Sequence, residues 1–131
     1  MLNLVEQTRL SPAEIMVIAY DFFVGKHGLT LIERIEHMHG SEGAVEISVV
    51  GSTLKGRIQY DPKMVFNQLT DYVQKQYGLT PVYILLHLHD AHKDDPGHLV
   101  IQADFDTPVE VRVETLEYET LAKEFVLSLP R

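Results

Sequence analysis

The sequence predicts one α+β domain over residues 1–131, with an antiparallel sheet of about five strands and helices packed against it. Three observations lead to this fold class. Capping signals precede apolar residues at helical spacing, later segments alternate apolar and polar residues, and turn signals separate those segments. The predicted order is α-α-β-β-α-β-β-β-α, in which a β-hairpin is followed by a helix and then by a three-stranded meander.

Helix signals begin near the N-terminus. Ser11 to Glu14 has the residues of a capping box with Pro at the first helical position, which predicts a helix from about Pro12 to Val24 that stops at Gly25. The same signature predicts a second, shorter helix from Thr30 to Gly40. Two further helices are expected over Asp61 to Tyr77 and from about Leu116 to Leu129.

The segment after the second predicted helix alternates with period two and predicts a β-hairpin. A two-residue turn at Gly51-Ser52, with Gly first as a type II′ turn requires, places Val45 opposite Ile58. The same register places Glu46 opposite Arg57, as a cross-strand ion pair.

The stretch from Val82 to Val113 predicts the meander. Only registers that pair even positions of its first strand with odd positions of its second keep both apolar sets on one face. The loop length places His89 opposite His98, and Phe105 is expected to continue the apolar set of the middle strand. The residues expected on the core face are Val82, Ile84, Leu86, Leu88, Leu99, Ile101, Val111 and Val113.

Composition argues against several classes of function. The chain has no cysteine, so neither disulfides nor thiolate metal sites are available, and we expect a cytoplasmic protein. The net charge of −8 opposes nucleic-acid binding, because affinity for phosphate backbones comes from Lys and Arg. No apolar stretch approaches the roughly 18 residues that predict a membrane span, so no membrane contact is expected.

Four of the seven histidines lie between His87 and His98. On a strand, two histidines separated by one residue share a face with Cβ atoms about 6.5–7 Å apart, so both rings can bind one metal ion. The predicted register adds His98 to the face of His87 and His89, and loop residues could complete the coordination. The candidate ligands of zinc or a similar divalent metal are His87, His89, His92, His98, Asp90 and Asp94.

An ordinary polar strand face is the competing interpretation. A solvent-facing strand needs polar residues at alternate positions, and His fills such positions at little cost beside Asp side chains. His37 and His39, at the expected end of the second helix, would interact favourably with the helix dipole. His37 could add a metal ligand if that helix packs nearby.

Parts of the chain resemble known architectures. Without its first helix, the predicted element order resembles the roadblock and profilin-like layout, which implies a dimerising scaffold or regulatory protein. The order of Glu46, His87, His89 and Asp104 resembles the ligand order of JAMM-type zinc isopeptidases, although the Ser of that family is absent. The spacing of His87, His89 and His92 resembles metallo-β-lactamase-like enzymes, without the Asp that precedes their third His. The two enzyme resemblances imply metal-dependent chemistry.

No catalytic residue can be assigned from the sequence, which leans against an enzyme. We expect a small acidic interaction or regulatory domain, such as an adaptor, inhibitor or immunity-type protein. It would bind a protein partner with a basic surface, or form a homodimer. The alternative is a metal-binding protein or a small metal-dependent hydrolase centred on His87 and His89. No cofactor other than such a divalent ion is expected.

Overall fold

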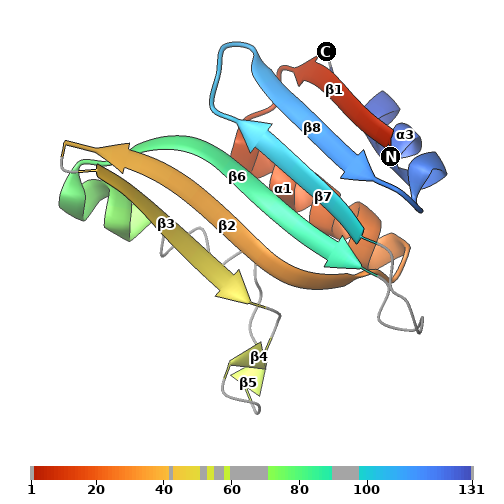
Figure 1. Ribbon diagram of the computed structural model, residues 1–131, viewed down its shortest axis with the longest axis horizontal. Helices are drawn as coiled ribbons and strands as arrows, with labels where there is room; N and C mark the ends of the chain where they lie inside the picture. The colour runs from red at the N-terminus through yellow and green to blue at the C-terminus, as the bar shows by residue number, and fades with distance from the viewer. Residues whose placement is uncertain are drawn as a thin grey trace.

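The computed structural model describes residues 2–41, 43–50, 53–54, 58–59, 71–89 and 98–130, which form one six-stranded sheet and a separate two-stranded ladder (Figure 1). The strands of the sheet are β1 (Leu2–Thr8), β2 (Thr30–Gly40), β3 (Gly43–Val50), β6 (Thr80–His89), β7 (His98–Asp104) and β8 (Val109–Thr115). The ladder consists of β4 (Thr53–Leu54) and β5 (Ile58–Gln59). The helices are α1 (Pro12–Tyr20), its π-helical continuation η1 (Asp21–Lys26), α3 (Glu119–Ser128) and a segment over 71–77.

The strands of the sheet follow the order β1-β8-β7-β6-β2-β3, and every neighbouring pair is antiparallel. The α+β class is therefore confirmed, with six strands rather than about five. The predicted meander is also confirmed as β6, β7 and β8. Its register pairs Leu86 with Ile101 and His89 with His98, as the alternation and the loop length together predict.

The core lies between the sheet and the helices, with α1 and α3 behind the sheet in Figure 1. Of the eight residues expected on the core face of the meander, Val82 is half-buried and the other seven are buried. Phe105 was placed wrongly, because it follows the last residue of β7 and is 36% exposed. Because the strand ends at Asp104, the Phe105 side chain does not follow the alternation of buried and exposed positions.

The N-terminus of α1 has the predicted capping box. The Ser11 hydroxyl accepts the Glu14 backbone N–H at 3.2 Å, and the Glu14 carboxylate accepts the Ser11 N–H at 3.4 Å. Helical structure does not stop at Gly25 as predicted, but continues through η1 to Lys26. The wider π-helical turn buries Phe23 in the core.

Residues Thr30–Gly40 form a strand, so the predicted second helix is wrong. β2 pairs along one edge with β3 and along the other with β6. Its core-facing positions include Arg34 and Glu36, each only 2% exposed. Because two charged residues occupy positions that an amphipathic strand normally fills with apolar ones, the period of two was not visible in the sequence.

The predicted hairpin is wrong as well. Val45 lies opposite Met38 of β2, and Glu46 lies opposite His37 rather than Arg57. Ile58 instead pairs with Leu54 in the ladder of β4 and β5. The turn predicted at Gly51-Ser52 and the residue Arg57 lie outside the described residues. The neighbouring strand β2 supplies a longer partner for β3, over eight paired positions.

Strand β1 was not predicted from the sequence, and it pairs with β8 through all seven of its residues. Leu2 and Leu4 are its only apolar residues on the half-buried side, because Glu6 and Thr8 occupy the next two positions. This short and partly polar alternation is a weak strand signal. The observed order therefore begins with a strand and has a strand in place of the second predicted helix.

The remaining helices agree with the predictions where the structure describes them. The helix over 71–77 ends at Gly78, whose positive φ of 61° a glycine adopts without strain. Its predicted start at Asp61 lies outside the described residues. In α3, Phe125 is fully buried and Leu121 packs against the core from a half-buried position. Within the described ranges, no helix has the length and apolar character of a membrane span.

Candidate metal centre

One face of the sheet is covered by α1 and α3, and no helix of the described residues covers the opposite face, which we call the open face (Figure 1). Side chains on the open face alternate with the buried ones along each strand. The described residues of this face include Glu33, His37 and His39 on β2, Glu46 on β3, Tyr83 and His87 on β6, His98 and Asp104 on β7, and Glu110 and Arg112 on β8. Histidine and carboxylate side chains therefore share one exposed surface.

His87 and His98 come from adjacent strands and meet on this face. The Nε2 atom of His87 lies 2.8 Å from the Nδ1 atom of His98, and the ring planes stack at 28° with centroids 5.1 Å apart. The two residues are diagonal neighbours, since His87 lies opposite Val100 while His98 lies opposite His89. Two of the predicted metal ligands are thus in direct contact through their ring nitrogens.

The separation of these nitrogens matches that of two ligands on one metal ion. Nitrogens bound at about 2.0–2.1 Å are about 2.9 Å apart at a right angle and about 3.3 Å apart at the tetrahedral angle. An ion at that bond length would lie to one side of the line that joins the two nitrogens, so both rings would turn toward it on binding. Without a metal, one ring nitrogen donates its hydrogen to the other, which requires complementary tautomers.

A carboxylate lies beside this pair. Glu33 on β2 is the direct cross-strand neighbour of His87, and such neighbours have Cβ atoms about 4.5–5.5 Å apart. The Ser48 hydroxyl donates to the Glu33 carboxylate at 3.5 Å. Glu33 is not among the ligands predicted from the sequence, because its segment was expected to be a helix.

The other predicted ligands are not placed by the structure. The backbone of His89 lies opposite His98, but its side chain and the residues Asp90, His92 and Asp94 lie outside the described part of the chain. Among the residues described, no three His, Asp or Glu side chains converge on one point. The described site is therefore a pair of imidazoles.

A second group of side chains lies further along the open face, and its assembly from His37, His39 and Glu46 was not predicted from the sequence, which offered only His37 as a possible further ligand. The Nε2 atoms of His37 and His39 are 2.9 Å apart, and the Nδ1 atom of His37 lies 3.0 Å from a carboxylate oxygen of Glu46. The Tyr83 ring stacks on the His37 ring, with the two ring centroids 5.0 Å apart and an interplanar angle of 8°. The expected helix-dipole interaction of His37 and His39 is wrong, because both lie on a strand.

The signal for this group was present in the sequence. His37 and His39 have the same one-residue spacing as His87 and His89, which puts both on one face only when the segment is a strand. Burial raises the pKa of the Tyr83 hydroxyl above its ordinary value, and the negative charges of Glu46 and Asp104 raise it further. Tyr83 is therefore neutral and present as a hydrogen-bond donor at physiological pH.

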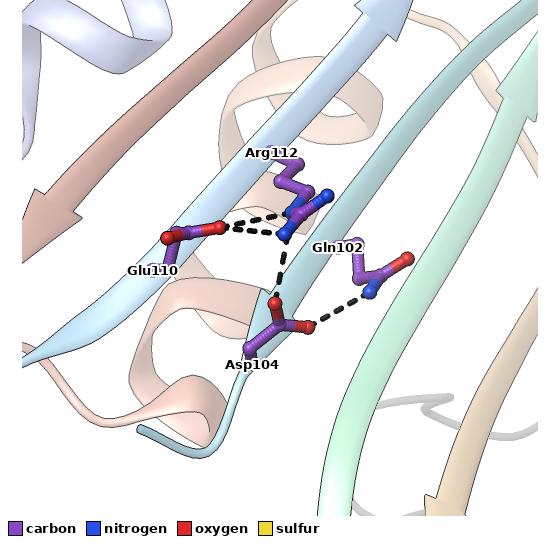
Figure 2. Close-up of polar contacts among 4 residues, drawn as sticks. All are labelled: Gln102, Asp104, Glu110 and Arg112. Atoms are coloured by element: carbon purple, nitrogen blue, oxygen red, sulfur yellow. Dashed lines mark hydrogen bonds and ion pairs between the residues drawn. The ribbon is translucent and has the colours of Figure 1, made fainter. Parts of the chain in front are cut away.

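Asp104 is engaged elsewhere on the open face (Figure 2). One carboxylate oxygen of Asp104 accepts a hydrogen bond from the Gln102 amide at 2.8 Å, and the other lies 3.6 Å from Nε of Arg112. The Nη2 atom of Arg112 also forms an ion pair with Glu110 at 2.8 Å. Asp104 lies opposite Tyr83 on β7, six residues after His98, which is the residue that pairs with His89. The ligand order that resembles zinc isopeptidases is therefore not brought together.

The fold and its surface define an α+β protein whose antiparallel sheet has one covered face and one open, histidine-bearing face. No family model, no curated protein and no solved structure matches this chain.

Proposed function

We propose that the protein binds a divalent transition-metal ion on the open face of its sheet through His87 and His98. The 2.8 Å separation of their ring nitrogens carries this proposal. The two residues are 11 positions apart in the chain, and strand pairing brings them together. Strands hold ligands more rigidly than loops do, so little ordering is needed on binding.

The donor atoms select the class of metal. Neutral imidazole suits zinc, copper, nickel and iron, whereas magnesium and calcium prefer oxygen ligands. Two imidazoles leave other coordination positions to water or to further side chains. Glu33 is one candidate for such a position, and His89, Asp90, His92 and Asp94 stay predictions from the sequence.

The test uses protein without a histidine tag. Equilibrium dialysis against Zn²⁺, Ni²⁺ and Cu²⁺, followed by elemental mass spectrometry, measures the bound ions per chain. The double variant His87→Ala/His98→Ala should lose one equivalent, because it removes both imidazole ligands of the site. His27→Ala is the matched control, since His27 follows η1 and does not lie on the sheet. An unchanged stoichiometry in the double variant would exclude the site.

A second measurement separates the loop ligands from the strand ligands. If Asp90 and Asp94 complete the coordination, the Asp90→Asn/Asp94→Asn variant should retain binding with lower affinity, whereas the histidine double variant should lose it. Zn²⁺ at about 100 times its dissociation constant should stabilise the native protein by about 2.7 kcal/mol. Thermal unfolding with and without Zn²⁺ checks this effect.

Binding of a protein partner is a second candidate function, and the open sheet face favours it. That face has no helix over it in Figure 1, and it carries the partly exposed apolar side chains of Ile35, Leu85 and Val100 beside its charged groups. The net charge of −8 fits a partner with a basic surface. Sedimentation equilibrium tests the simplest partner, a second copy of the chain. A dimer that Leu85→Arg dissociates would support this face as the interface, and a monomer at all concentrations would exclude the homodimer.

A further inference from the structure

We propose that His37 and His39 form a second site for a divalent transition-metal ion, on the part of the open face formed by β2 and β3. Glu46 acts there as the carboxylate that positions the His37 ring. This site is separate from the one at His87 and His98, and it does not depend on that site. The observation that carries it is the convergence of two Nε2 atoms to 2.9 Å, with a carboxylate on the far side of one ring.

The contact with Glu46 determines which nitrogen of His37 carries its hydrogen. A carboxylate only accepts hydrogen bonds, so the Nδ1 atom of His37 must donate to Glu46. In the neutral ring the Nε2 atom then keeps its lone pair, and this lone pair points toward His39. Metal-binding histidines generally have this arrangement, in which the second ring nitrogen donates to a carboxylate that orients the ring.

His39 completes the pair by a change of tautomer. Without a metal, its Nε2–H donates to the lone pair of His37 across 2.9 Å. When its hydrogen moves to Nδ1 and the exposed His39 ring shifts to one side, both Nε2 lone pairs can point at one ion. The separation already equals the about 2.9 Å expected for two nitrogens at a right angle around a metal.

The packing around His37 holds the ring in place before any ion binds. Its side chain is 19% exposed, and Tyr83 covers one face of the ring with nearly parallel planes. Glu46 is the direct cross-strand neighbour of His37 on β3, so the strand register itself sets their contact. A ligand that is fixed in advance loses little conformational entropy on binding.

The two histidine pairs are too far apart to share an ion. His37 lies opposite Tyr83 on β6, and Tyr83 precedes His87 by four residues. At about 3.3 Å per residue, this spacing places the two sites about 13 Å apart, whereas two-metal centres hold their ions about 3.5–4 Å apart. The open face therefore offers two separate mononuclear sites.

The site should prefer ions in the order that imidazole ligands follow, with Cu²⁺ bound more tightly than Ni²⁺ and Zn²⁺. To isolate it, the chain is studied without a tag and with the His87→Ala/His98→Ala substitutions. Isothermal titration with Cu²⁺ and with Ni²⁺ should still show one equivalent bound. A further His37→Ala or His39→Ala substitution should remove that equivalent.

Glu46→Ala in the same background tests the positioning role. Loss of the carboxylate should weaken metal binding about 10- to 100-fold, because such partners fix the tautomer and the orientation of the ligand. Glu114→Ala is the matched control, since it removes the same charge from an exposed strand position and should leave the affinity within about twofold. If Glu46→Ala and Glu114→Ala weakened metal binding equally, Glu46 would act only through its charge, and its assignment as the residue that positions His37 would be wrong.

Failure of this site can be distinguished from failure of the first. If the His87→Ala/His98→Ala protein binds no Cu²⁺ while the His37→Ala/His39→Ala protein binds one equivalent, only the first site exists. The reverse result leaves only the second. Nuclear magnetic resonance supplies a measurement that does not depend on stoichiometry, because paramagnetic Ni²⁺ or Cu²⁺ should broaden the ring signals of His37 and His39 and spare those of His27. Far-ultraviolet circular dichroism checks that each variant is folded.

Discussion

Arg34 and Glu36 illustrate how single residues decide the character of a strand. Both project from β2 into the covered face of the sheet, where each is 2% exposed and has an interaction partner. Buried charges are costly unless they are paired and hydrogen-bonded, so strands rarely carry two at alternate positions. Here the interaction partner of each side chain offsets part of the cost of its burial.

Leu86 is the clearest single-residue test of the register. It is 1% exposed on the covered face of β6, opposite Ile101. Leu86→Ala should lower the free energy of unfolding by about 2–5 kcal/mol through lost burial and a cavity. Arg112→Ala, on the open face, should cost less than about 1 kcal/mol, since its ion pairs are half exposed to water. Urea denaturation measures both, and equal losses would contradict the assignment of faces.

The capping box of α1 acts on one helix. Ser11 and Glu14 satisfy each other's backbone N–H groups at the first turn, where no intrahelical partner exists. Pro12 follows at the first helical position with its φ already close to helical values. The start of α1 is therefore a local property, which explains why it could be recognised without any knowledge of the fold.

Removing this cap should destabilise the protein measurably. Ser11→Ala should cost about 1 kcal/mol of unfolding free energy, within the range of about 0.5–2 kcal/mol known for such caps. Ser48→Ala is a suitable control, because Ser48 lies on an exposed strand position and makes only a 3.5 Å contact with Glu33. Thermal unfolding compares the two variants. A loss for Ser48→Ala as large as that for Ser11→Ala would argue against the cap.

At the level of the molecule, the two ends of the chain are joined. β1 adds to the sheet beside β8, and the Thr8 hydroxyl and the Arg9 N–H both donate to the carbonyl of Pro130 after α3. In Figure 1 the C-terminus accordingly lies beside the end of β1. The strand order makes β1 and β3 the edges of the large sheet and encloses the meander between them.

Hydrogen exchange should reveal this order. Amide hydrogens of β8 should exchange as slowly as those of β7, because β8 has a partner strand on each edge, β1 on one and β7 on the other. In β3, alternate amides should exchange much faster, since one edge of that strand has no partner in the described sheet. Nuclear magnetic resonance resolves the individual amides. Alternate fast exchange along β8 would show that β1 does not dock as described.

The sequence by itself determined the features that arise from local interactions. The capping box, the glycine after the 71–77 helix and the alternation of the meander predict structure over a few residues, and the described structure has all three. The shared buried face limits the register to pairs of even with odd positions, and the loop length then predicts the pairing of His89 with His98.

Only the tertiary structure decided which strands lie beside β1, β2 and β3. β2 was hidden by its buried charges and β1 by its polar positions, and β3 pairs with β2 rather than with the segment that follows it. The contact of His37 with Glu46 depends on the pairing of β2 with β3. The physical reason is that strand pairing joins residues distant in the chain, and the free energy of that pairing comes from the shared core rather than from the residues of either strand alone.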